Sequence, residues 1–266
     1  MEQNKKSRKK QTDWGVLYFS GTGNTKYCAV RLAEALGASD KPCALEQKEA
    51  VQVLKCHDDL IFAYPVQYSN LPDIVRVFIV ENHMCWRGKR VFLMATMGAF
   101  SGDGTGVAAR LLKRYGAVVT GGVHIQMPDS VADVKTLIRP DEKNRQIVAE
   151  AGKRVQETAK KMKQGKMPQQ GLGVGSHLLG LFGQRLYFWN AAEKYKDQLT
   201  IDTAKCIACG HCVNRCPREN LVIQDGRPKP QGKCTMCYRC ISECPSQAIT
   251  LIGKEVIEQI RIDNFI

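Results

Sequence analysis

The sequence predicts an α/β protein in two parts: a doubly wound parallel sheet with helices on both faces, followed by a small, cysteine-rich α+β domain. Two observations carry this prediction. Strand and helix signals alternate along residues 14–164, which is typical of parallel sheets. Eight of the 12 cysteines then lie within residues 206–244, whereas the other four are scattered between residues 28 and 85.

The first elements of the sheet domain follow from short apolar runs and one helical stripe. The run Trp14–Phe19 predicts the first strand, and Leu60–Tyr64 predicts the third. Between them, apolar residues at helical spacing predict a helix that ends at Gly37. The second strand gives the weakest signal and is expected near Pro42–Leu45.

The remaining elements continue the alternation as helix, strand, helix, strand and helix. They are expected at Ile74–Val80, Arg90–Thr96, Val107–Tyr115, Ala117–Gln126 and Asp141–Lys163. We therefore divide the chain into a basic, disordered tail, a sheet domain, a bridge rich in glycine and aromatic residues, and a cysteine-rich domain with a C-terminal tail, at residues 1–13, 14–164, 165–197 and 198–266. The bridge is expected to pack between the domains; its alternative is an amphipathic helix on a membrane surface.

Composition narrows the class of protein. The chain of 266 residues is 44% hydrophobic and 24% charged, as in ordinary globular proteins, which excludes disordered and fibrous classes. No apolar segment of a signal peptide follows the basic first ten residues, and no run of about 18 apolar residues predicts a membrane span. We expect a cytoplasmic, reducing location, where cysteines serve as metal ligands or plain thiols.

A net charge of +13 accompanies this composition. Basic residues gather in the first ten positions and at 153–166, where six of them face only Glu157. No aromatic or groove pattern goes with these patches, so we expect no nucleic-acid partner. An acidic redox protein and peripheral contact with a membrane surface remain the alternatives at these patches, and the sequence does not predict an oligomeric state.

A phosphate-binding loop is predicted directly after the first strand. Here the chain turns through two glycines into a helix, whose N-terminal N–H groups and dipole favour an anion. The loop contains no lysine and matches neither the P-loop nor the G-x-G-x-x-G spacing, so neutral groups must bind the phosphate. Its six residues are Ser20, Gly21, Thr22, Gly23, Asn24 and Thr25.

This segment resembles the fingerprint S/T-x-T-G-x-T of flavodoxins. The resemblance covers residues 14–164 and implies strand order 2-1-3-4-5 with FMN at the switch point of the sheet. It also implies that two further loops embrace the flavin ring: Tyr64, Pro65, Val66, Gln67 and Tyr68 after the third strand, and Thr96, Met97, Gly98, Ala99 and Phe100 after the fourth. Tyr68 and Phe100 are the expected stacking aromatics. The alternative is that these loops are turns without a ligand.

The cysteine-rich domain contains the pattern C-x₂-C-x₂-C-x₃-C-P twice, beginning at Cys206 and at Cys234. Zinc sites more often pair two cysteines and then leave a long gap, so three successive x₂ spacings favour an iron–sulfur cluster. The repeat resembles bacterial ferredoxins with two [4Fe–4S] clusters, in which the fourth cysteine of each run binds the other cluster. This implies one set at Cys206, Cys209, Cys212 and Cys244, and another at Cys234, Cys237, Cys240 and Cys216.

The whole chain thus resembles flavodoxin–ferredoxin fusion proteins, which are described in anaerobes. The resemblance implies an electron-transfer protein that relays electrons between two [4Fe–4S] clusters and FMN for a separate redox enzyme. Two alternatives remain open. The chain could reduce a small molecule such as a quinone or nitro compound at the flavin, or the first domain could be a docking module without flavin.

Overall fold

A computed structural model describes residues 13–67, 70–99, 102–173, 175, 195 and 198–266 of the chain. Tyr68, Phe100, most of the predicted bridge and the basic tail up to residue 12 lie outside the described residues.

Five parallel strands form the central sheet, in the predicted order 2-1-3-4-5. They are β1 (Trp14–Tyr18), β2 (Cys43–Ala44), β3 (Asp59–Pro65), β4 (Arg90–Met97) and β5 (Val118–Gln126). Successive side chains of a strand point to opposite faces, so in β3 Leu60 and Phe62 enter one core whereas Ile61 enters the other. Because both faces are covered, the strand reads as a continuous apolar run.

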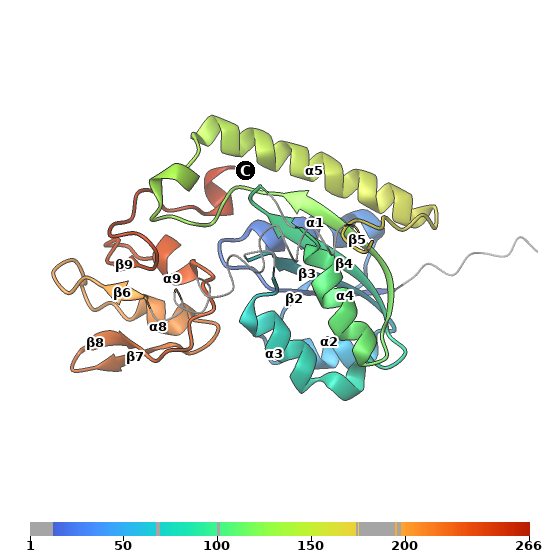
Figure 1. The fold of residues 1–266 in the computed structure, drawn as a ribbon, viewed down its shortest axis with the longest axis horizontal. Helices are drawn as coiled ribbons and strands as arrows, with labels where there is room; N and C mark the ends of the chain where they lie inside the picture. Colours follow the sequence, from blue (N-terminus) through green and yellow to red (C-terminus); the bar gives the residue numbers. More distant parts are fainter. Residues whose placement is uncertain (1–12, 68–69, 100–101, 174, 176–194, 196–197) are drawn as a thin grey trace, which may run out of the picture.

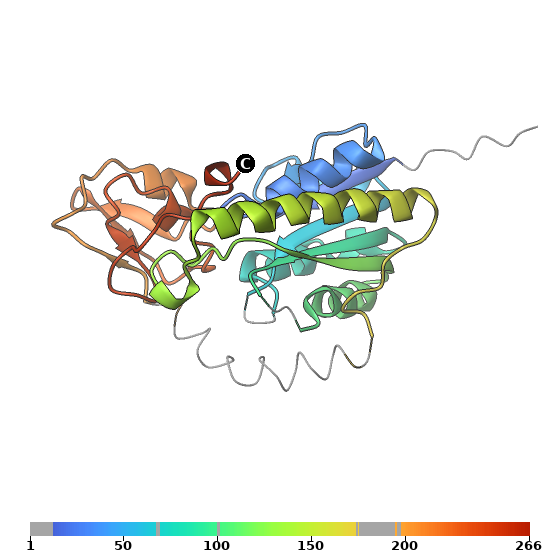
Figure 2. The ribbon, with the colours of Figure 1, turned by 90° about the horizontal axis from the view of Figure 1, so that it is seen from above.

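Helices cover both faces of this sheet (Figures 1 and 2). One face carries α1 (Asn24–Leu36) and α5 (Asp141–Lys163), and the other carries α2 (Ala50–Cys56), α3 (Asp73–Glu81) and α4 (Gly104–Arg114). Two short 3₁₀ helices lie at His83–Trp86 (η1) and Lys135–Leu137 (η2). Gly37 ends α1 as predicted, in the left-handed conformation with φ 73°.

The small domain is built from two pairs of antiparallel strands and two short helices. The pair β6 (Thr200–Ile201) and β9 (Ile249–Thr250) joins its two ends, and β7 (Leu221–Gln224) forms a hairpin with β8 (Arg227–Pro230). Asp225 and Gly226 turn this hairpin with φ of 53° and 73°, which Asp-Gly pairs tolerate. The helices are α8 (His211–Arg215) and α9 (Arg239–Ser242).

After the small domain, the chain returns to the flavodoxin-like sheet. The 3₁₀ helix η4 (Ile262–Asn264) lies near α1 (Figure 2), and Ile260, Ile262 and Phe265 are buried in the core that α1 and α5 share. In the same segment, Gln259 donates to the Ile241 and Cys244 carbonyls at 2.9 and 2.7 Å, so the segment contacts both domains. Within the described residues, none of the helices has the length and apolar character needed to cross a membrane.

Candidate functional site

A cavity of about 440 Å³ opens at the carboxyl ends of β1, β3, β4 and β5. Its volume falls in the range of small-molecule and cofactor sites, and this edge is where ligands bind in open parallel sheets. No Lys, Arg or His among the described residues lines it. The predicted residues found in its wall are Ser20, Gly21, Thr22, Asn24, Thr25, Pro65, Val66, Gln67, Thr96, Met97, Gly98 and Ala99.

Of the predicted residues that the structure describes, two lie outside this wall. Gly23 precedes α1 with φ 96°, and it lines the neighbouring groove instead. Tyr64 is fully buried, and its hydroxyl donates to the Gly104 carbonyl at 2.8 Å. Tyr64 shares its face of β3 with Leu60 and Phe62, so it belongs to the core.

Side-chain hydrogen bonds fix the loop between β1 and α1. The Thr25 and Thr96 hydroxyls lie 2.7 Å apart, and the Asn24 amide donates to the Pro128 carbonyl at 2.8 Å. Thr22 and Ser130 join their hydroxyls at 2.9 Å. The Ser20 Oγ, in contrast, is buried with no partner.

This donor set fits a phosphate group. The unpartnered Ser20 hydroxyl and the first N–H groups of α1 are hydrogen-bond donors at the rim of the cavity. Binding by neutral donors alone agrees with the lack of cationic side chains among the described lining residues. The rest of the lining is mostly apolar, as a flavin ring requires.

Part of the wall was missed by the sequence prediction. The segment after β5 contributes Met127, Pro128, Asp129, Ser130 and Val131, and the rule that ligands gather at carboxyl ends of strands could have indicated it. Burial raises the pKa of the Asp129 carboxyl. A Cβ on Gly98 would come within 2.6 Å of Asp129 Oδ2, so any other residue there would push this carboxylate aside.

The remaining wall comes from the cysteine-rich domain. Met236, Cys237, Tyr238 and Ile252 line the same cavity, together with Tyr195 from the bridge. Gln67 donates to the Thr235 and Met236 carbonyls, both at 3.0 Å, and so joins the loop after β3 to this domain. No sequence periodicity encodes such contacts, because they join residues about 170 positions apart.

The eight cysteines of the double run gather into two sets. One cavity contains Cys216, Cys234, Cys237 and Cys240, and a second contains Cys206, Cys209, Cys212 and Cys244. In each set, the fourth cysteine comes from the opposite run. This crossed grouping matches the two predicted sets of ligands.

Burial and neighbouring sulfurs raise the thiol pKa values in these cavities. The pKa of Cys212 rises to about 11, first through burial and then through Cys244, and that of Cys237 rises to about 12 through burial. Thiolates are the ligands of iron, so binding of a cluster must release protons from both sets. Backbone N–H groups already donate to sulfurs of both sets, from Asn220 to Cys216 at 3.2 Å, from Met236 to Cys234 at 3.4 Å and from Ala248 to Cys244 at 3.4 Å.

The repeat is visible in the backbone as well. Non-glycine residues with positive φ occur at matching places of the two runs, namely Ala208 with Met236 and Glu219 with Gln247. A third pair combines Gly210 with Tyr238. Such conformations cost energy and mark functional turns; here they bend the chain so that successive cysteines face one point.

Comparisons with known proteins agree with this geometry. Residues 15–122 match the family model described as flavodoxin domain, and residues 198–245 match the model of a 4Fe-4S dicluster domain. The chain joins a flavodoxin domain to a 4Fe-4S dicluster domain. The first implies FMN and the second implies iron–sulfur clusters, which makes the chain an electron-transfer protein of the flavin and iron–sulfur type.

Solved structures similar to the flavodoxin domain were also found. The flavodoxin of Megasphaera elsdenii is 25% identical, with 52% of this chain and 97% of that chain covered and a TM-score of 0.39. A WrbA-like protein of Agrobacterium tumefaciens is 18% identical, with 57% and 98% covered and a TM-score of 0.42. Flavodoxin 2 of Bacillus cereus is 18% identical, with 58% of this chain and 99% of that chain covered and a TM-score of 0.40. The search of curated proteins returned no match.

Proposed function

We propose that this flavodoxin–ferredoxin fusion relays electrons between two [4Fe–4S] clusters and FMN on behalf of a separate redox protein. One observation carries the proposal: Cys237 lines both the sheet-edge cavity and the cavity that contains Cys216, Cys234 and Cys240. A ligand of one cluster would then border the flavin directly. The protein's part in such a relay is to hold the centres close and to control their hydrogen bonding and burial.

The roles of the residues follow from their places. The loop Ser20–Thr25 would hold the FMN phosphate, and Val66, Gln67 and the segment 96–99 would hold the ring, with Tyr68 and Phe100 as proposed stacking partners. Met236 and Tyr238 would face the ring from the iron–sulfur side. The cysteines would bind the clusters in the two crossed sets described above.

The two cluster sites differ in access. Cys209 is exposed, and its neighbour Ile207 is 66% exposed, whereas Cys237 lies in the wall of the flavin cavity. We therefore assign exchange with the redox partner to the cluster of Cys206, Cys209, Cys212 and Cys244. The other cluster would lie between this entry point and FMN.

Anaerobic purification with iron, sulfide and flavin analysis tests the cofactor set. We expect about eight irons and one FMN per chain. Chemical reduction of the clusters should then bleach the flavin absorbance within the same molecule. About four irons, or no flavin, would contradict the relay.

A turnover assay with small oxidants distinguishes the carrier from a reductase. A carrier should reduce quinones and nitro compounds slowly and without saturation. Rapid, saturable turnover without a protein partner would show that the protein is a small-molecule reductase and not a carrier.

A further inference from the structure

Two carbonyl groups of the phosphate loop bond to residues from the far end of the chain. The Ser20 carbonyl accepts from Arg239 Nη2 at 2.7 Å, and the Thr22 carbonyl accepts from the Ile262 N–H at 3.0 Å. Neither donor belongs to the flavodoxin domain. A phosphate loop needs its N–H groups to face the anion, so bonds that hold its carbonyls fix the loop in its binding conformation.

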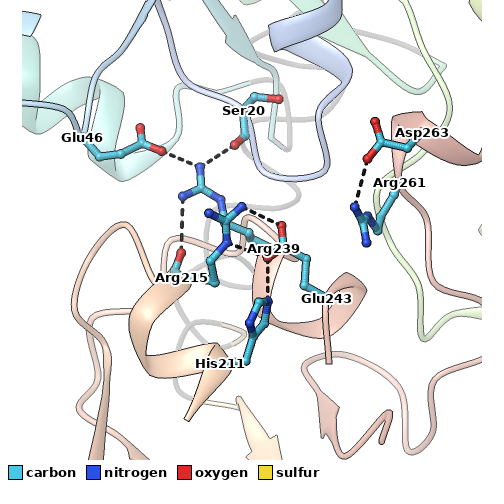
Figure 3. A network of polar contacts seen from close by, with 8 residues as sticks. All are labelled: Ser20, Glu46, His211, Arg215, Arg239, Glu243, Arg261 and Asp263. Atoms are coloured by element: carbon cyan, nitrogen blue, oxygen red, sulfur yellow. Dashed lines mark hydrogen bonds and ion pairs between the residues drawn. The ribbon is translucent and has the colours of Figure 1, made fainter. Parts of the chain in front are cut away.

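Arg239 is held firmly in the groove between the domains. Figure 3 shows its guanidinium between Glu46, Ser20 and the backbone of Arg215. Its Nη2 also contacts Glu46 Oε1 at 2.5 Å, and Nη1 donates to the Arg215 carbonyl at 3.3 Å. The Arg239 side chain is only 12% exposed, so these charged hydrogen bonds are protected from solvent.

The backbone of Arg239 is tied to a cluster site. The residue lies between Cys237 and Cys240, two of the proposed ligands of one cluster. The contact of the Arg239 guanidinium with the Ser20 carbonyl therefore depends on whether that cluster site is assembled. In the same region, the loop packs tightly against the far domain: a Cβ on Gly21 would overlap the Cys237 carbonyl, and one on Gly23 would overlap the Ile262 side chain.

We infer that the iron–sulfur domain and the C-terminal segment complete the FMN phosphate site, so that cluster assembly and FMN binding are thermodynamically linked. Assembly of the cluster at Cys216, Cys234, Cys237 and Cys240 places Arg239 against the Ser20 carbonyl and strengthens FMN binding. Linkage is reciprocal, so bound FMN stabilises the cluster to the same degree. This inference rests on the proposed FMN site, and Arg239 and Ile262 act in it as positioning residues that do not touch the flavin.

The test measures the Kd of FMN by fluorescence quenching, with clusters present and after anaerobic chelation of the iron. In the unmodified chain, removal of the clusters should weaken FMN binding about tenfold, the size expected for one charged hydrogen bond. Arg239→Gln, with its clusters intact, should have the weaker Kd already. Removal of its clusters should change the Kd little further.

Two more variants complete the design. Arg215→Gln removes an arginine of the same groove that pairs with Glu243, at 2.7 Å, and not with the phosphate loop; its Kd should equal that of the unmodified chain. Ile262→Pro removes the N–H that bonds Thr22. Proline suits this first position of η4, and Arg261 before it is extended, with φ −134° and ψ 143°. Ile262→Pro should weaken FMN binding. If Arg239→Gln loses its clusters, this second variant tests whether bonds to the carbonyls of the phosphate loop support FMN binding.

Specific results would overturn the linkage. These are an unchanged Kd after removal of clusters from the unmodified chain, or an unmodified Kd in either Arg239→Gln or Ile262→Pro with full iron content. A chain that carries clusters but never binds FMN would instead refute the proposed function, so the two failures are distinguishable.

Discussion

The carboxylate of Asp133 joins the two domains through three hydrogen bonds. Its Oδ1 accepts from the Tyr238 hydroxyl at 2.9 Å, and its Oδ2 accepts from the N–H groups of Leu251 and Ile252 at 2.7 and 2.9 Å. Asp133 is buried, with 4% exposure. Because this contact is buried, water cannot readily replace the carboxylate as the acceptor for the backbone N–H groups of Leu251 and Ile252.

Asp133→Ala should lower the stability of the holoprotein by about 3–5 kcal/mol, because it removes a buried acceptor of three hydrogen bonds, two of them from backbone N–H groups. Asp133→Asn is the matched control: its oxygen can accept both N–H groups while its amide donates to the Tyr238 oxygen. Anaerobic thermal unfolding measures both. Equal melting temperatures for the two variants would show that the hydrogen bonds are not what the alanine removes.

Asp129 gives the FMN site a dependence on pH. Burial raises the pKa of this carboxyl, and a flavin in the cavity would bury it further and raise the pKa again. Protonated Asp129 then favours FMN, so the Kd should be constant below the pKa of the free protein. It should increase as the pH rises toward the pKa of the complex and level off above it.

The measurement is the Kd of FMN against pH for the unmodified chain and for Asp129→Asn. The amide cannot titrate, so any dependence left in the variant comes from groups other than Asp129, among them the FMN phosphate. Parallel curves for the two proteins would contradict the prediction.

The residues of the phosphate loop could be predicted from the sequence because the end of the strand, the glycines and the start of the helix follow one another in one short segment. The structure places Ser20, Gly21, Thr22, Asn24 and Thr25 at the cavity, as that pattern indicates. Tyr64 was assigned to the site although it falls on the core-facing side of β3. Side chains alternate between the two faces of a strand, so Tyr64 lies on the same face as Leu60 and Phe62. The sequence alone did not show which core this face enters.

Among the helices, length decided which could be predicted. The helix Asp141–Lys163 has 23 residues, enough for several repeats of its apolar positions, and its expected bounds are confirmed. The helix α2 has seven residues, of which only Ala50 and Leu54 are buried, so it carries too little periodicity to be recognised. The strand β2 has two residues, and it lies within the expected Pro42–Leu45.

The C-terminal segment is held by its apolar side chains. Phe265 is 4% exposed in the core of the flavodoxin domain, whereas the next residue, Ile266, is 71% exposed. Phe265→Ala should therefore lower the free energy of unfolding by about 3–5 kcal/mol. Ile266→Ala, one residue further on, should stay within about 0.5 kcal/mol of the unmodified chain. Similar melting temperatures for both variants would mean that the segment does not pack as described.

Over the entire molecule, the arrangement of the two domains is what the sequence could not predict. Their contacts depend on complementary surfaces, such as Gln67 against the Thr235 and Met236 carbonyls, and not on any repeat. The arrangement also places one basic patch away from the iron–sulfur domain. The basic last turn of α5, with Lys160, Lys161 and Lys163, lies at the end of the flavodoxin domain away from the iron–sulfur domain (Figure 1).

One cluster site borders the flavin cavity and the other is exposed, so substitution of a cysteine in each site should have a different effect on electron transfer. Cys237→Ser alters the cluster site that borders the flavin cavity, so reduction of the other cluster should no longer bleach the flavin within the same molecule. Cys209→Ser alters the exposed site. It should leave transfer between the inner cluster and FMN intact while slowing reduction by an external protein donor.

Anaerobic stopped-flow absorbance, with iron counted for each variant, measures both steps. If flavin reduction within Cys237→Ser matched that of the unmodified chain, electrons would reach FMN by a path that avoids the shared wall. The position of Cys237 would then be a matter of packing alone.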